Sequence, residues 1–306
     1  MSRLYARIGT FRQLEIWLAV FSHGSITQAS KALHLTQPTV SMQLKKLSEA
    51  LDAPLYHAVG RKLVFTDEGI ALAKSAREVL GAIDHLDMRL ADMKGLKVGR
   101  LRIAMVTTAK YFIPHLLGEF LQQYPDIDVD FKVGNRQQII ERMETGEDDF
   151  YVFSHPPKGE SIALHEFLSN PLVPIVPEDH PLASQPRVSL NDFLSQRFLM
   201  REQGSGTRHA IERHLETLGA NIDSRMTIES NEAIKHAVMS GLGVSILSSH
   251  TLAFGGSAGL AQLEVEHLPI MTKWYLANLS AKEPSVVAKA FLDYVTENNL
   301  DRVIRD

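Results

Sequence analysis

The chain has no cysteine among its 306 residues. Disulfide bonds and thiolate metal sites are therefore excluded, and the cytoplasm is the simplest expected location. Residues 237–263 lack Asp, Glu, Lys and Arg, but they contain five Gly and five Ser. That composition fits buried α/β elements better than a membrane span. We expect no secretory or membrane segment and no membrane partner.

Motifs for metal binding and catalysis are also lacking. The 13 His residues show no HExxH spacing, and we find no GxSxG elbow and no nucleotide fingerprint. The segment Gly204-Ser205-Gly206-Thr207 is not a phosphate-binding P-loop, because no Gly-Lys-Ser/Thr follows it. We therefore expect a protein that is not an enzyme and that holds no metal and no cofactor.

Charge is unevenly distributed along the chain. Residues 1–65 contain eight basic and three acidic side chains, a net charge of +5, whereas the remainder has 24 basic and 33 acidic side chains, a net charge of −9. A basic head on an acidic body is the electrostatic pattern of a DNA-binding domain joined to another unit.

Residues 23–65 predict a winged helix-turn-helix. Ser25 and Thr36 are suited to cap two helices, residues 26–33 and 36–51, and an earlier helix over residues 11–21 supplies a third. In the second helix Val40 and Leu44 point to the core, so the opposite face is free for base edges. Residues 55–65 read as two strands around a cationic tip. The predicted DNA-contacting residues are Gln37, Pro38, Thr39, Ser41, Met42, Lys45, Lys46, Arg61 and Lys62. An ordinary helical hairpin is the alternative.

A long helix is expected over residues 66–94, with Thr66 as its cap. Its apolar residues follow a 4-3-4-3 spacing, which is a heptad seam. The seam predicts dimerisation and hence an inverted-repeat DNA site, and a helix packed on its own chain is the alternative. The predicted dimerisation residues are Leu72, Val79, Ile83, Leu86 and Leu90.

Strands and helices alternate from residue 95 to residue 306, which predicts a two-lobed α/β effector-binding domain. We expect the first lobe at about 96–170 and 271–306 and the second at about 171–270, with a cleft between them for a small anion. Polar residues recur at the ends of successive strands, although helix capping alone explains any one of them. The candidate effector-binding residues are Thr107, Thr108, Asn135, Arg201, Gln203, Ser205, Thr207 and Asn231.

Several motifs resemble those of LysR-type transcriptional regulators. They are Phe11-Arg12-Gln13-Leu14, Gly24 to Ser30, Leu35 to Ser41, Arg61-Lys62 and Thr66 to Gly69. Farther along, Gly134 to Gln138, His155-Pro156-Pro157, Arg201 to Arg208 and Ser230 to Lys235 resemble the branch that controls carbon-fixation and inorganic-carbon uptake operons. The resemblance implies a periplasmic-binding-protein-like body, a homotetramer, promoter DNA and RNA polymerase as partners, and a small anionic metabolite as effector.

This chain departs from the family pattern at two places. Met42 stands where many relatives have Arg, so an apolar contact to a thymine methyl is expected there. The acidic segment Glu147-Asp148-Asp149 precedes Phe150 and Tyr151 at a strand entering the cleft, and we expect Tyr151 and Phe153 to reshape the pocket.

Other functions remain open at this point. A regulator of an unrelated metabolic operon would show the same motifs, and an enzyme with a DNA-binding head or a solute-binding protein would share parts of the pattern. The basic head and the expected absence of a signal peptide argue against a solute-binding protein.

Overall fold

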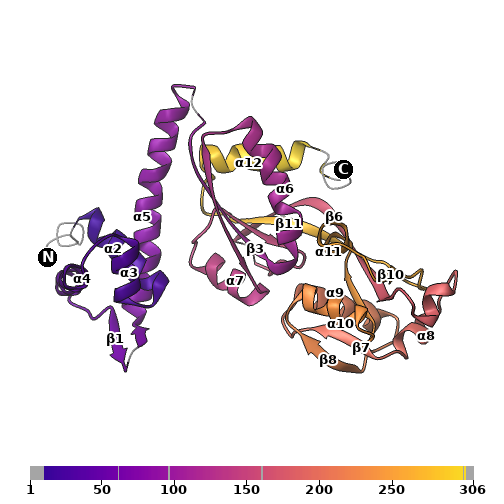
Figure 1. Cartoon of the computed structure of the whole chain (residues 1–306). Coiled ribbons are helices and arrows are strands. Elements are labelled where there is room, and N and C mark those ends of the chain that lie inside the picture. The colour runs from indigo at the N-terminus through magenta and orange to yellow at the C-terminus, as the bar shows by residue number, and fades with distance from the viewer. Residues whose placement is uncertain (1–9, 61, 96, 160, 299, 301–306) are drawn as a thin grey trace. The chain divides into compact units, whose positions relative to one another are not determined.

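Two compact units make up the computed structural model, which describes residues 10–60, 62–95, 97–159, 161–298 and 300. The head contains the residues up to Gly95 together with Thr145–Glu147. The body contains Leu96–Glu144 and Asp148–Asp306. The helices and strands are drawn in Figure 1.

The head is a winged helix-turn-helix followed by a long helix (Figure 1). The predicted caps are confirmed, because the hydroxyls of Ser25, Thr36 and Thr66 accept hydrogen bonds from the backbone N–H of the third residue in their helices. The elements are α2 (Phe11–His23), α3 (Ile26–Ala32), α4 (Gln37–Leu51), β1 (Tyr56–Val59), β2 (Lys62–Phe65) and α5 (Asp67–Asp92).

An aromatic cluster joins the three-helix core of the head to its hairpin. Trp17 is fully buried, and its ring lies 5.9 Å from Phe21, 6.5 Å from Tyr56 and 5.7 Å from Phe65, centroid to centroid. Such rings contribute more than their buried area alone. The hairpin is therefore held against the same core that supports α4.

Three parallel strands of a larger mixed sheet, with helices on both faces, form the first lobe of the body (Figure 1). Side chains alternate across the sheet, as the two-residue period of a strand requires. Tyr151 and Phe153 pack with Ile139 and Met143 of α7, whereas Phe150 meets Phe291 of α12. The elements are β3 (Gly99–Val106), η1 (Thr107–Tyr111), α6 (Ile113–Gln123), β4 (Ile127–Gly134), α7 (Arg136–Glu144), β5 (Phe150–Phe153) and α12 (Val286–Glu297).

Two long antiparallel strands connect the lobes. They are β6 (Ile162–Pro177) and β11 (Ile270–Leu279), and they pair from Ile162 with Leu279 to Leu172 with Ile270. The continuous apolar run Leu172–Val176 lies in the second half of β6. Its first half carries His165 and Glu166 among apolar residues, so a continuous apolar run is missing there.

The second lobe contains a short parallel pair of strands. Its apolar core includes Phe193, Phe198 and Met200, with Ile211 and Leu215 contributed by α9. The elements are η2 (Pro181–Ser184), α8 (Leu190–Leu194), β7 (Phe198–Arg201), α9 (Gly206–Thr217), β8 (Ser224–Ile228), α10 (Asn231–Met239), β9 (Ser245–Ser248), α11 (Ser249–Gly255) and β10 (Leu260–Gln262).

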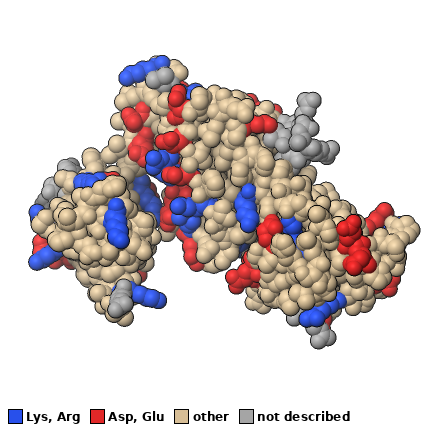
Figure 2. Space-filling view, in the orientation of Figure 1, with Lys and Arg blue, Asp and Glu red and all other residues tan. Residues whose placement is uncertain are grey.

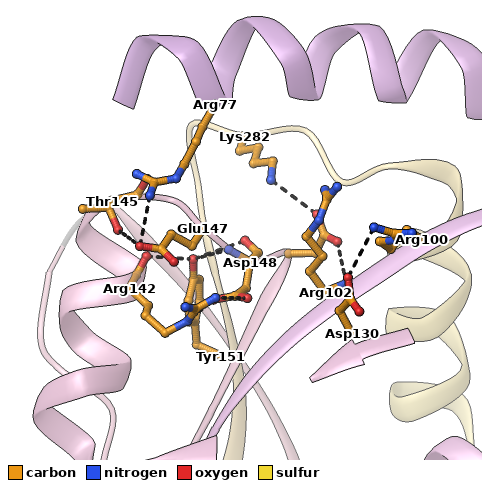
Figure 3. A network of polar contacts seen from close by, with 11 residues as sticks. Arg77, Arg100, Arg102, Asp130, Arg142, Thr145, Glu147, Asp148, Tyr151 and Lys282 are labelled. Atoms are coloured by element: carbon orange, nitrogen blue, oxygen red, sulfur yellow. Dashed lines mark hydrogen bonds and ion pairs between the residues drawn. The ribbon is translucent and has the colours of Figure 1, made fainter. Parts of the chain in front are cut away.

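The acidic segment before β5 has a structural role. Asp148 forms a two-point ion pair with Arg142, at 2.8 and 2.9 Å, and its backbone N–H donates to the hydroxyl of Tyr151 (Figure 3). Asp149 accepts from the backbone N–H of Arg102 at 2.9 Å and from Lys282 at 3.3 Å. These contacts fix the start of β5.

The expectation that Tyr151 and Phe153 reshape the pocket is wrong. Both side chains have 0% exposure and belong to the core beneath α7. Their hydrophobicity and the alternation of β5 place them on the inner face of the sheet.

Candidate functional site

The outward face of α4 is the candidate DNA-binding surface of the head. Val40, Leu44 and Leu47 are buried with at most 1% exposure, so the residues between them must point away from the core. Among the predicted contacts on this helix, the exposed ones are Gln37, Pro38, Ser41, Met42, Lys45 and Lys46, while Thr39 is half-buried. The outward face of α4 therefore presents polar and cationic side chains to solvent, as the sequence predicts.

Hydrogen bonds fix the first turn of α4. The Gln37 Nε2 donates to the Thr27 hydroxyl of α3 at 2.6 Å, and the hydroxyls of Thr36 and Thr39 lie 2.8 Å apart. These bonds tie the start of α4 to the preceding helix and to its own cap. A rigid first turn lowers the entropic cost of placing Gln37 and Thr39 against DNA.

Cationic groups continue beyond that turn. Lys45 lies 3.9 Å from Glu49, but its side chain is 79% exposed, so this ion pair neutralises little of its charge. Lys62 is exposed at the start of β2, and Gly60 forms the tip of the hairpin with φ of +62°. Lys and Arg side chains on the head appear in blue in Figure 2. The predicted contact at Arg61 lies outside the described residues.

The seam on α5 is divided into two parts. Leu72 is 8% exposed and Ala76 is 1% exposed, and both belong to the core of the head. The prediction for Leu72 is therefore wrong, because the first three turns of α5 pack on their own chain. The later seam residues remain exposed by 42% or more, and they are Val79, Ile83, Leu86, Leu90 and Met93.

In the body, four of the candidate effector-binding residues meet. The guanidinium of Arg201, 3% exposed, donates from Nη1 to the Asn231 Oδ1 and from Nη2 to the Thr107 hydroxyl at 3.3 Å. The Asn231 amide in turn donates to the Thr108 hydroxyl at 3.0 Å. The cluster joins the end of β3 to β7 and to the first turn of α10. We call it the threonine–arginine cluster.

Glu202 neutralises the arginine of this cluster. Its carboxylate accepts from the Arg201 Nε at 2.7 Å and from Nη2 at 2.8 Å, in the two-point geometry typical of strong ion pairs. An anion entering the cluster therefore competes with Glu202 for the charge of Arg201.

Asn231 does not cap α10. Ser230 caps α10 by accepting from the backbone N–H of Ala233, whereas Asn231 is the first residue of the helix. Its side chain is thereby free to reach Arg201 and Thr108, and it is 4% exposed. A buried amide held by two partners is well satisfied.

A second polar group is centred on Glu232, the residue after Asn231 in α10. The Tyr111 hydroxyl donates to Glu232 at 2.6 Å, and Lys235 pairs with the same carboxylate at 3.3 Å. Burial and the hydrogen bond to Glu232 raise the pKa of Tyr111. Partial burial acts to raise the pKa of Glu232, but the hydrogen bonds from Tyr111 and Lys235 lower it overall.

The remaining candidates do not join the threonine–arginine cluster. The Asn135 Oδ1 accepts from the backbone N–H of Gln138 and so caps the start of α7. Gln203 is exposed, whereas Ser205 and Thr207 are buried at the start of α9, with 6% and 5% exposure. Ser205 is the N-cap residue of α9, and Thr207 is the second residue of that helix.

The sequence analysis missed a cationic cavity beside this loop. The cavity has a volume of about 830 Å³ and lies between the segment after β5 and helix α9. The imidazole rings of His155 and His209 lie 4.2 Å apart at its wall. Spacing on α9 was a usable signal, because His209 and Arg213 are four residues apart and share a face. The charged and imidazole side chains that line the cavity are Arg136, His155, Lys158, Arg208, His209, Glu212, Arg213 and Glu216.

Two further observations concern the described part of the chain. No three His, Asp or Glu side chains in it are grouped so that they could hold a metal ion. No helix within the described ranges has both the length and the apolar character needed to span a bilayer.

Comparison with protein families gives two matches that together cover most of the chain. The family described as bacterial regulatory helix-turn-helix protein, lysR family, matches residues 11–70. The family described as LysR substrate binding domain matches residues 94–299. The first match contains α4, and the second contains both the threonine–arginine cluster and the cationic cavity.

Individual relatives agree with these families. The HTH-type transcriptional activator CmpR of Synechocystis sp. is 45% identical over 287 residues, 94% of each chain. The RuBisCO operon transcriptional regulator of Acidithiobacillus ferrooxidans is 36% identical over 296 residues, 96% of each chain.

Solved structures show the same architecture. The regulatory domain of Synechocystis CcmR, solved in complex with 2-PG, is 46% identical and has a TM-score of 0.61, covering 65% of this chain and 96% of that one. CbnR, a LysR family regulator at 21% identity, has a TM-score of 0.70, covering 97% of this chain and 100% of that one. The chain belongs to the LysR family and is a DNA-binding transcriptional regulator.

Proposed function

We propose that this regulator controls genes for carbon fixation or inorganic-carbon uptake and that a small anionic metabolite changes how it binds or bends its promoter. The observation that carries this proposal is the threonine–arginine cluster, which joins groups from both lobes through Arg201 and Asn231. The named roles of CmpR and of the RuBisCO operon regulator support the set of target genes.

Anion binding at the cluster has a defined chemistry. Two threonine hydroxyls, a buried guanidinium and an amide are donors suited to carboxylate or phosphate oxygens. The ligand would replace Glu202 as the partner of Arg201. Because the cluster contains groups from both lobes, the ligand stabilises the lobe arrangement in which it touches both. The 2-PG named for the CcmR regulatory domain belongs to this class of anion.

Self-association is the second part of the proposal. The exposed seam of Val79, Ile83, Leu86 and Leu90 packs against a second copy, and two such dimers form a tetramer. Two recognition helices then face an inverted-repeat site in the promoter. RNA polymerase is the partner through which a promoter-bound protein of this kind acts.

We assign no cofactor and no catalytic activity to this chain. The effector is a reversible ligand, and the polar groups of the threonine–arginine cluster bind one another rather than activating a nucleophile. A regulator that binds promoter DNA works in the cytoplasm.

The test begins with selection of a DNA site from a random library by the full chain. Binding and bending of that site are then measured by fluorescence anisotropy and by fluorescence energy transfer, with and without 2-PG. We expect 2-PG to change the affinity or the bend angle for the wild-type protein but not for Asn231→Ala. Asn191→Ala, which alters an exposed amide on α8, should keep the response.

Two results would contradict the proposal. A wild-type protein that binds its site but ignores 2-PG would show that this anion class is not the effector. An Asn231→Ala protein that is folded and yet binds no DNA would show that the cluster serves the DNA-binding head directly.

A further inference from the structure

The cationic cavity beside α9 contains an uncompensated positive charge. Four of its side chains, Arg136, Lys158, Arg208 and Arg213, are cations at neutral pH, whereas only Glu212 and Glu216 are anions. The formal charge of the lining is therefore +2 when the histidines are neutral.

The distribution of ion pairs leaves these cations available. The Glu212 carboxylate forms an ion pair with Arg208, with 2.7 Å between Oε1 and Nε. Within the described residues, Arg136, Lys158 and Arg213 form no ion pair, and the only hydrogen bond of the Arg136 guanidinium goes from Nε to the backbone oxygen of His155 at 2.9 Å. Their remaining donors face a cavity with room for a ligand.

The histidine pair shows the effect of this crowding. Burial first, and then the neighbouring His209, Arg136, Arg213 and Lys158, lower the pKa of His155 to about 4. His155 is therefore neutral at physiological pH. A bound anion would offset the repulsion from the neighbouring positive groups and so raise the pKa of His155.

We propose that this cavity is a second anion-binding site, distinct from the threonine–arginine cluster, which takes a dianionic phosphoryl group between Arg136 of α7 and Arg213 of α9. A phosphoryl dianion matches the +2 charge of the lining, and its three oxygens accept from both guanidinium groups and from His209. The two sites differ in charge, because Glu202 neutralises Arg201 whereas no carboxylate of the described ranges pairs with the guanidinium groups of Arg136 and Arg213.

The position of the site gives it a structural effect. Arg136 and Lys158 belong to the first lobe, whereas Arg213 belongs to the second. A bound phosphoryl group therefore links the lobes on the α9 side. This inference goes beyond the proposed function, because phosphate can bind here whatever the target genes and the effector of the threonine–arginine cluster are.

The test is a titration of the full chain with inorganic phosphate, followed by NMR of the imidazole C–H groups. The signals of His155 and His209 are assigned by comparison with His155→Asn and His209→Asn. We expect phosphate to shift both signals and to raise the pKa of His155. We expect Arg136→Gln and Arg213→Gln each to weaken phosphate binding by about tenfold, the effect of losing one charge-assisted hydrogen bond.

Matched variants separate charge from fold. Arg213→Lys keeps the positive charge and should retain most of the binding, whereas Arg197→Gln removes an exposed arginine elsewhere in the second lobe and should bind like wild type. Thermal melts check that each variant is folded. Unshifted histidine signals, or folded Gln variants that bind as tightly as wild type, would overturn the proposal.

A parallel titration with 2-PG identifies the source of the phosphoryl group. If 2-PG shifts the same two histidine signals, and Arg213→Gln prevents this, the group belongs to that ligand. If only inorganic phosphate shifts them, the cavity takes a separate anion. The promoter response to 2-PG is measured independently, so failure of this site and failure of the proposed function are distinguishable.

Discussion

Gly69 and Leu55 are in direct contact where α5 passes the start of the hairpin: a Cβ on Gly69 would lie 2.1 Å from the carbonyl oxygen of Leu55. Only a residue without a side chain fits between the helix and that backbone. The same helix contains Gly81, where an added Cβ would meet nothing within 4 Å.

We expect alanine substitutions at these two glycines to have opposite effects on stability. Gly69→Ala should destabilise the head by about 1–3 kcal/mol, because the backbone must shift to admit the methyl group. Gly81→Ala should stabilise α5 by about 0.5–1 kcal/mol, because alanine is the better helix former. Urea unfolding followed by circular dichroism measures both, and a Gly69→Ala protein as stable as wild type would contradict the packing described here.

Lys45 should contribute to DNA affinity through phosphate charge. Lys45→Gln should weaken binding to all sequences, and the plot of log affinity against log salt should become less steep by about one. Lys289→Gln removes an exposed lysine from α12 of the body and should leave the slope unchanged. Anisotropy titrations at several salt concentrations test this, and equal slopes for all three proteins would remove Lys45 from the interface.

The exposed half of the seam should hold the dimer together. Leu86→Asp should cost about 3–6 kcal/mol over the two copies of a symmetric pair, because each copy loses a buried leucine. Lys74→Asp places the same charge on an exposed position of α5 outside the seam and should leave the assembly intact. Sedimentation velocity distinguishes the outcomes, and an unchanged mass for Leu86→Asp would refute the seam.

His155 should make stability depend on pH. Its pKa is about 4 in the folded chain, below the ordinary value of 6.5, so the unfolded chain binds more protons between these values. The folded state should therefore lose stability as the pH falls from 6.5 towards 4. His155→Asn should flatten this dependence, whereas His236→Asn, at an exposed position of α10, should not. Melting temperatures at pH 7, 6, 5 and 4.5 provide the measurement.

Local patterns in the sequence predicted much of the head. Caps and apolar spacing are properties of a few neighbouring residues, so Ser25, Thr36 and Thr66 could be identified as helix starts and Val40 and Leu44 as core. The exposed positions of α4 then followed from 3.6-residue periodicity. The burial of Leu72 in its own chain could not be predicted, because the apolar spacing of a seam is the same whether its own chain or a second copy covers it.

Contacts between distant segments were harder to predict. The pairing of Thr107 with Arg201 spans 94 residues, and only their common position at strand ends suggested it. The cationic cavity combines α9 with the segment after β5, and neither of them is unusual alone. Periodicity assigns a side chain to a face of its own element, but it does not state which element will lie opposite.

The two strands that join the lobes restrict how the body can move. A slip of β6 against β11 by one residue would turn every paired side chain to the wrong face, so the lobes cannot slide along these strands. Bending at the register shift between Trp274 and Tyr275 leaves the pairing on either side intact. A ligand held by both lobes can therefore change the angle between the lobes but not the register of the strands that join them. A change in this angle is the conformational signal that ligand binding would produce in the body.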